Sequence, residues 1–183
     1  MRLGPPDPNH LTAEQKRVHD IIASGPRGRV RGPLAIWLHR PELAEAAQAL
    51  GAYCRYGSSL DPRLSELAIL CMACVWQAEF EWWAHKPIAL KAGLAPEIVE
   101  ALEAGERPSF ADREEAVVHD VVFALSGERR IPDELYAKGM DVLGAGRLVD
   151  LVGLCGYYTL ISMTLNAFDV PLPDGETYEL TTR

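Results

Sequence analysis

The sequence has few cysteines, no excess of positive charge and no apolar stretch near its start. Four cysteines in 183 residues are too few for a disulfide framework and are typical of a reducing compartment. The 26 acidic residues outnumber the 18 basic ones, giving a formal net charge of -8, so the surface should repel nucleic-acid phosphates. No uninterrupted apolar run approaches the roughly 20 residues that cross a bilayer. We therefore expect a cytoplasmic protein with neither nucleic acid nor a membrane as partner.

The alternating β-branched runs and tight turns of β-hairpins are also missing, whereas helical start signals recur. Thr12 to Gln15 fits a capping box. A capping signal or a first-turn proline also begins helical periodicity at Pro41, Asp61-Pro62, Ser109 to Asp112 and Pro132. The segment GPRGRVRGP, residues 25–33, is predicted to be a loop. Together these signals predict an all-α fold.

Two long elements should form the centre of the protein. The first is a central helical element from Asp61 to Ala92, and the second is a buried core helix from Arg147 to Phe168. The chain length fits one domain. We divide it into an N-terminal tail and helix (1–32), a core (33–110), and C-terminal helices with a tail (111–183).

The clearest candidate for chemistry is the pair Glu81 and His85. Their spacing of four residues places both side chains on one helix face. A carboxylate beside an imidazole favours acid and base chemistry near neutral pH, although many such pairs are ordinary surface contacts. Pro87 and the neighbouring tryptophans favour a pocket wall. Further candidates for lining that pocket are Trp82, Tyr157, Tyr158 and Arg55.

The run from Leu34 to Leu102, including the pattern His-x-x-x-Ala-x-x-x-Gly-Leu that begins at His85, resembles the carboxymuconolactone decarboxylase domain. Alkylhydroperoxidases (AhpD-like) of the same superfamily have a glutamate, a Cys-x-x-Cys pair twelve residues later, and a histidine four residues after the second cysteine. Glu66 and His85 match the glutamate and the histidine, but Ala78 and Glu81 occupy the cysteine positions. Residues 33–110 would therefore be the family core, without the peroxidase pair.

The resemblance implies an AhpD-like helical bundle that forms trimers or hexamers. It also implies a lyase of the decarboxylase branch, acting without metal or organic cofactor on a small carboxylated lactone from aromatic-compound breakdown. Glu66, Glu81 and His85 would then be the catalytic residues, with His85 moving a proton.

Two alternatives remain open at this stage. Cys71 and Cys74 form a Cys-x-x-Cys pair that could support alkylhydroperoxidase activity from an unexpected position. Their apolar surroundings favour two structural cysteines instead, because burial suppresses the thiolate. The other alternative is a non-catalytic oligomeric protein that keeps the fold.

Overall fold

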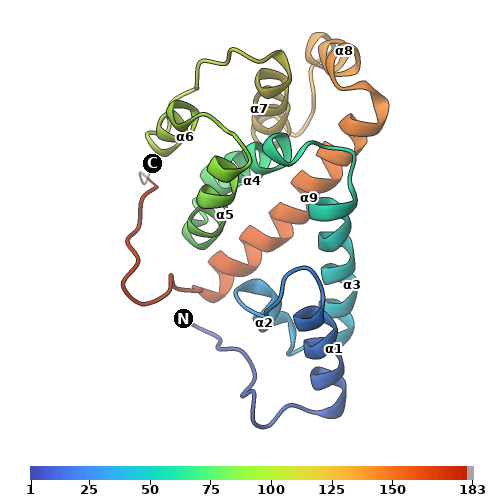
Figure 1. Ribbon diagram of the computed structural model, residues 1–183, viewed down its shortest axis with the longest axis vertical. Helices are drawn as coiled ribbons and strands as arrows, with labels where there is room; N and C mark the ends of the chain where they lie inside the picture. The colour runs from blue at the N-terminus through green and yellow to red at the C-terminus, as the bar shows by residue number, and fades with distance from the viewer. Residues whose placement is uncertain (181–183) are drawn as a thin grey trace.

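A computed structural model describes residues 1–180, and within this range every regular element is helical (Figure 1). The all-α prediction is confirmed. The helices are α1 Ala13–Ser24, α2 Pro33–Trp37, α3 Pro41–Ala52, the π-helix η1 Tyr53–Gly57, α4 Pro62–Trp76, α5 Glu79–Lys91, α6 Pro96–Glu103, α7 Arg113–Gly127, α8 Asp133–Val142 and α9 Gly144–Phe168.

The helix starts follow the local signals in the sequence. Thr12 and Gln15 form both halves of a capping box before α1. Asp61 accepts a hydrogen bond from the backbone amide of Arg63 at the start of α4, and Asp112 does the same for Glu114 at the start of α7. These side chains satisfy amides that have no partner within their own helix.

The prediction of one central helical element from Asp61 to Ala92 is wrong, because the chain reverses between α4 and α5. Helix α4 ends at Trp76, and Gln77 adopts a left-handed conformation with φ of 51°. The Gln77 side chain donates a hydrogen bond to the Cys74 carbonyl, which also accepts one from the Gln77 backbone amide at the helix end. Helices α4 and α5 therefore pack side by side (Figure 1).

Helix α4 lies at the centre of the core and contacts α5, α6, α7 and α9. Every residue from Leu64 to Ala73 is buried. By length and composition α9 could cross a membrane, but 56% of its most apolar window is buried inside the protein, where it packs on α2, α3, α4 and α8. It is thus the second core helix, as the sequence predicts.

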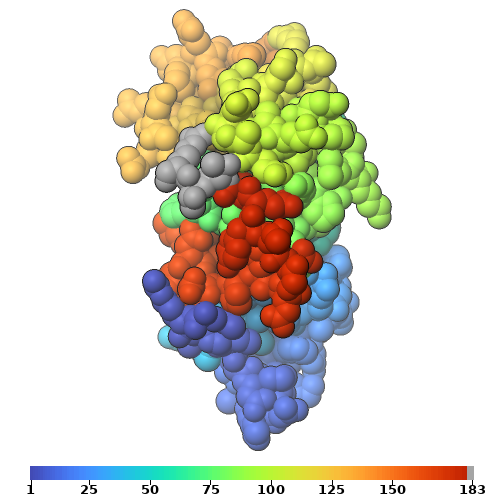
Figure 2. All heavy atoms as spheres, turned by 90° about the vertical axis from the view of Figure 1, so that its left-hand side faces the viewer, coloured from blue at the N-terminus to red at the C-terminus, as the bar shows by residue number. Residues whose placement is uncertain are grey.

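The C-terminal tail after α9 turns back over the same chain. Figure 2 shows this segment, in red, lying across the middle of one face. The tail reaches helix α5, where the Glu79 carboxylate accepts hydrogen bonds from the backbone amides of Glu179 and Leu180. Leu180 is buried there.

Candidate active site

The α4–α5 reversal brings Glu66 and His85 together. His85 Nδ1 lies 2.5 Å from Glu66 Oε2, and both side chains are more than nine-tenths buried. Nineteen residues separate the two in the sequence, so only the antiparallel packing of the two helices explains the contact. The hydrogen bond fixes the orientation of the imidazole ring.

The other ring nitrogen of His85 faces two more groups. Glu81, one turn earlier on α5, has Oε1 at 3.0 Å from His85 Nε2. The hydroxyl of Tyr158, from α9, lies 3.4 Å from the same nitrogen, and the Tyr158 ring meets the imidazole edge-on. His85 therefore sits between two buried carboxylates, with a phenol beside it.

These neighbours set the protonation of the site. Burial acts to lower the pKa of His85, but attraction by Glu81 and the hydrogen bond with Glu66 outweigh it, so the pKa lies above its ordinary value of 6.5. Burial raises the pKa of Tyr158 well above its usual range. His85 is thus a proton carrier suited to neutral pH, and Tyr158 is a neutral hydroxyl.

Arg55 reaches the site from the π-helix η1. Its Nη2 atom lies 4.0 Å from Glu66 Oε1, and its guanidinium is over the ring of Tyr56. The carboxylate of Asp150 on α9 holds the start of η1 and the chain just after it, because it accepts hydrogen bonds from the Tyr53 hydroxyl and from the amide and hydroxyl of Ser59. Single π-turns of this kind are frequent at functional sites.

A cavity of about 70 Å³ lies against this group of side chains. Of the residues predicted from the sequence, Arg55, Glu81, His85, Tyr157 and Tyr158 line it. Glu66 lies behind His85. Trp82 does not line the cavity, because its side chain points to the tail, where Nε1 donates a hydrogen bond to Glu179. Within residues 1–180 no group of three or more His, Cys, Asp or Glu is arranged to bind a metal ion.

Gly51 allows the cavity wall to close. A Cβ atom at this position would lie 2.1 Å from the Tyr157 hydroxyl and 2.5 Å from Arg27 Nη2, which no real packing permits. Arg27 donates a hydrogen bond to that hydroxyl. Arg27 and Arg31 also line the cavity, although the sequence predicts only a loop for the segment that contains them.

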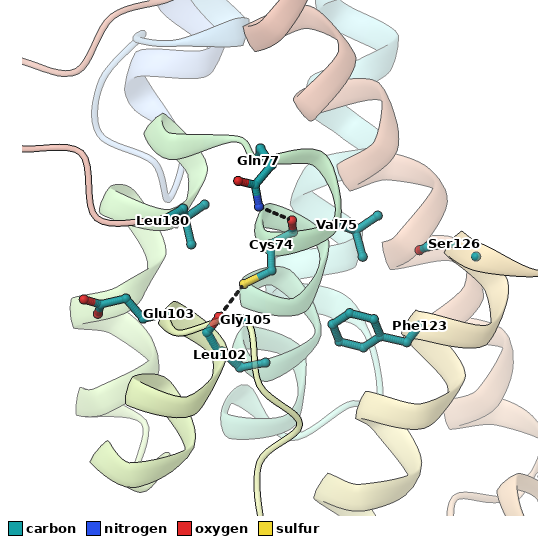
Figure 3. Close-up of a pocket in the computed structure, with 10 residues that line it drawn as sticks. Cys74, Val75, Gln77, Leu102, Glu103, Gly105, Phe123, Ser126 and Leu180 are labelled. Carbon is teal, nitrogen blue, oxygen red and sulfur yellow. Dashed lines mark hydrogen bonds between the residues drawn. The ribbon is translucent and has the colours of Figure 1, made fainter. Parts of the chain in front are cut away.

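Two other cavities, of about 240 and 570 Å³, lie beside Cys74, and Figure 3 shows the smaller of them. The Cys74 thiol donates a hydrogen bond to the Leu102 carbonyl. Cys71 is fully buried one turn earlier, and burial raises the pKa of its thiol well above the usual range. Neither cysteine lines the cavity beside His85.

Fold and site together define an all-helical domain with a buried histidine between two glutamates. Residues 41–119, from the start of α3 into α7, match the sequence model of the carboxymuconolactone decarboxylase family. No curated protein matches the chain. The matched stretch is under half of the chain, and it resembles the carboxymuconolactone decarboxylase family.

Several solved structures share the fold. A peroxidase-related protein with an alkylhydroperoxidase AhpD core from Ralstonia eutropha JMP134 has a TM-score of 0.74 and 13% identity, over 94% of this chain and 92% of that chain. A peroxidase-related protein from Silicibacter sp. TM1040 has a TM-score of 0.73 and 17% identity, over 97% and 93%. A protein of unknown function from Agrobacterium tumefaciens has a TM-score of 0.67 and 18% identity, over 75% and 94%. At these identities the likeness concerns the fold.

Proposed function

We propose that the protein is a cofactor-independent enzyme of the carboxymuconolactone decarboxylase type, which moves a proton during loss of carbon dioxide from a small carboxylated lactone. The observation that supports this most is the placement of His85 between Glu66 and Glu81 at the wall of a cavity. A positioned acid or base of this kind contributes about 10² to 10⁴ in rate. We also propose a cytoplasmic location, on the basis of the cysteine usage.

Decarboxylation needs little machinery beyond such a group. When the bond to the carboxylate breaks, carbon dioxide leaves and the bonding electron pair moves into the conjugated carbonyl of the substrate, forming an enolate. The neutral Tyr158 hydroxyl and the Arg55 cation can stabilise that negative charge. Protonated His85 then delivers a proton to carbon and regains one from solvent. Glu81 stabilises the imidazolium, and Glu66 acts as a positioning residue through Nδ1.

The experiment is a panel of carboxylated lactones incubated with the protein in D₂O. We expect carbon dioxide release from at least one of them, with one deuterium bound to carbon in the product. His85→Ala should reduce the rate by about 10²-fold or more. Glu97→Gln, on the separate helix α6, is the matched control and should retain the native rate. Failure of the native protein to release carbon dioxide from any member of the panel would count against the proposal and favour the non-catalytic alternative.

The alkylhydroperoxidase alternative has less support, because Cys71 is buried and its thiol pKa is raised. Thiol-dependent peroxide consumption that is lost in Cys71→Ser with Cys74→Ser would favour it over decarboxylation.

A further inference from the structure

The loop between α1 and α2 places a cluster of positive charge at the entrance to the site. A second cavity of about 220 Å³ adjoins the first and shares His85 with it. Its lining includes three arginines of the loop and one from η1, namely Arg27, Arg29, Arg31 and Arg55. This concentration of guanidinium groups stands out in a chain whose net charge is -8.

The three loop arginines have little compensation from carboxylates, whereas the pKa of Arg55 is raised, because Tyr158, Tyr56 and the carboxylates of Glu66 and Glu81 outweigh its burial. Within residues 1–180 no carboxylate lies within ion-pair distance of Arg27, Arg29 or Arg31, and the carboxylate oxygen paired with Arg55 is 4.0 Å away. The Nε atoms of Arg27 and Arg55 are buried without a hydrogen-bond acceptor. Burying such donors without a partner costs free energy, and an anion in the cavity would remove that cost.

Aromatic rings, which carry no neutralising charge, hold two of the arginine side chains in place. The guanidinium of Arg31 lies 5.1 Å from the centre of the Trp83 ring, and that of Arg55 lies 5.1 Å from the Tyr56 ring. Burial lowers the pKa of Arg31, as do the nearby charges of Arg29 and Arg55, while Glu81 acts in the opposite direction. A planar guanidinium binds an anionic oxygen pair with two parallel hydrogen bonds.

Gly32 sets the position of this loop. Its φ is 57°, and a Cβ atom there would lie 2.6 Å from Cε1 of Phe80 on α5. Glycine therefore lets the loop lie directly against the helix that bears Glu81 and His85.

The volumes of the two cavities indicate which part of a bound molecule each one can hold. The inner cavity, at about 70 Å³, is far below the roughly 300 to 1,000 Å³ of ordinary ligand pockets. It can take only the reacting end of a molecule. The rest of the molecule must extend into the outer cavity, toward Arg29 and Arg31.

We propose that Arg27, Arg29 and Arg31 are specificity-determining residues, which bind an anionic group of the substrate remote from the atoms that react beside His85. The substrate is accordingly a small molecule with at least two anionic groups. The assignment of the reacting end rests on the proposed function, whereas the binding of an anion at the loop does not.

The test is a titration calorimetry series at constant ionic strength with succinate, butyrate, succinamide and inorganic phosphate as probes. We expect succinate to bind the native protein at least about tenfold more tightly than butyrate, and succinamide to bind weakest. Phosphate presents similar anionic oxygens, and its affinity relative to succinate identifies which anionic group the loop prefers.

Arg29→Gln combined with Arg31→Gln should remove most of the preference for the dianion and raise the KM of a turned-over substrate more than it lowers kcat. Arg113→Gln, an exposed residue paired with Asp141 on α8, is the matched control and should bind succinate as the native protein does. Equal affinity for succinate and butyrate, or undiminished succinate affinity in the double variant, would overturn the inference.

A separate variant distinguishes this inference from the proposed function. His85→Gln should abolish turnover but keep the affinity for succinate. Native binding of dianions without any decarboxylation would contradict the proposed function alone. Turnover without any preference for dianions would contradict the role of the loop alone.

Discussion

His85 is subject to opposing effects on its charge, and their balance makes stability depend on pH. Burial disfavours the imidazolium, whereas Glu81 and Glu66 favour it, and the net effect is a pKa above the ordinary 6.5. The folded protein therefore binds this proton more tightly than the unfolded chain does. The resulting stabilisation is fully present below about pH 6.5 and is lost as the pH rises through the folded-state pKa.

We predict that His85→Gln flattens this part of the pH profile. The free energy of unfolding, measured by urea denaturation between about pH 5 and about pH 9, should fall with rising pH for the native protein relative to the variant. A difference between the two proteins that is constant over this range, or that grows with pH, would show that the carboxylates do not dominate the environment of His85.

Gly51 has no reactive side chain, but the absence of a Cβ atom there allows Tyr157 and Arg27 to occupy their positions at the cavity. We predict that Gly51→Ala destabilises the protein by about 1 to 3 kcal/mol, because the new methyl group must displace the Tyr157 hydroxyl or Arg27. Gly127→Ala on α7 is the control, since a Cβ there meets nothing within 4 Å. It should be neutral or stabilising by up to about 1 kcal/mol. Thermal denaturation that gives the two variants equal stability would contradict this account of the packing.

At the scale of helices, local signals in the sequence predict most of the helix starts. They do not predict the reversal of the chain between α4 and α5. Caps and first-turn prolines are local features, so the starts of α1, α3, α4 and α7 were predictable. The reversal at Gln77 has no glycine or proline. Periodicity paired Glu81 with His85, but only the family resemblance could add Glu66, because the contact depends on how α4 packs on α5.

Two short elements beside the arginines, α2 after the loop and η1 around Arg55, were also missed, for a physical reason. Helix α2 has only five residues, and η1 is held by the hydrogen bonds of Tyr53 and Ser59 to Asp150, far away in the sequence. Neither has a strong local signal. Arg29 and Arg55 line the same cavity because of how the helices pack. The composition of the sequence does not predict that packing.

The C-terminal tail supports the helix that bears the site. The Glu179 carboxylate accepts hydrogen bonds from Trp82 Nε1 at 2.9 Å and from Lys86 Nζ at 2.8 Å. Trp82 is fully buried, so its indole needs this acceptor. The ion pair with Lys86 is partly exposed and contributes little.

We predict that Glu179→Ala lowers the free energy of unfolding by about 1 to 2 kcal/mol, mainly by leaving the Trp82 donor without a partner. Glu176→Ala is the matched control. The Glu176 side chain is exposed and forms no hydrogen bond or ion pair within residues 1–180. Urea denaturation should separate the two variants, and an equal effect of both would mean that the tail does not stabilise α5.

For the whole molecule, we propose assembly into a symmetric homo-oligomer. Large apolar side chains are exposed on two neighbouring helices, α3 and α9: Leu43, Leu50, Val149, Val152 and Met163. Surfaces of this kind mark contacts with other chains. Sedimentation velocity at micromolar concentration should show a trimer or hexamer, and Val149→Asp should shift it toward monomer. A native protein that sediments only as monomer would contradict the proposal.

The measurement that tests the central claim most directly is a double-mutant cycle on Glu81 and His85, with a substrate identified by the lactone panel. If the two side chains act as one proton-transfer unit, His85→Ala and Glu81→Gln should each reduce kcat by about 10²-fold or more. The double variant should lose far less than the product of the two effects. Near-native turnover in His85→Ala, or losses that multiply independently, would contradict the claim that this buried pair performs the chemistry.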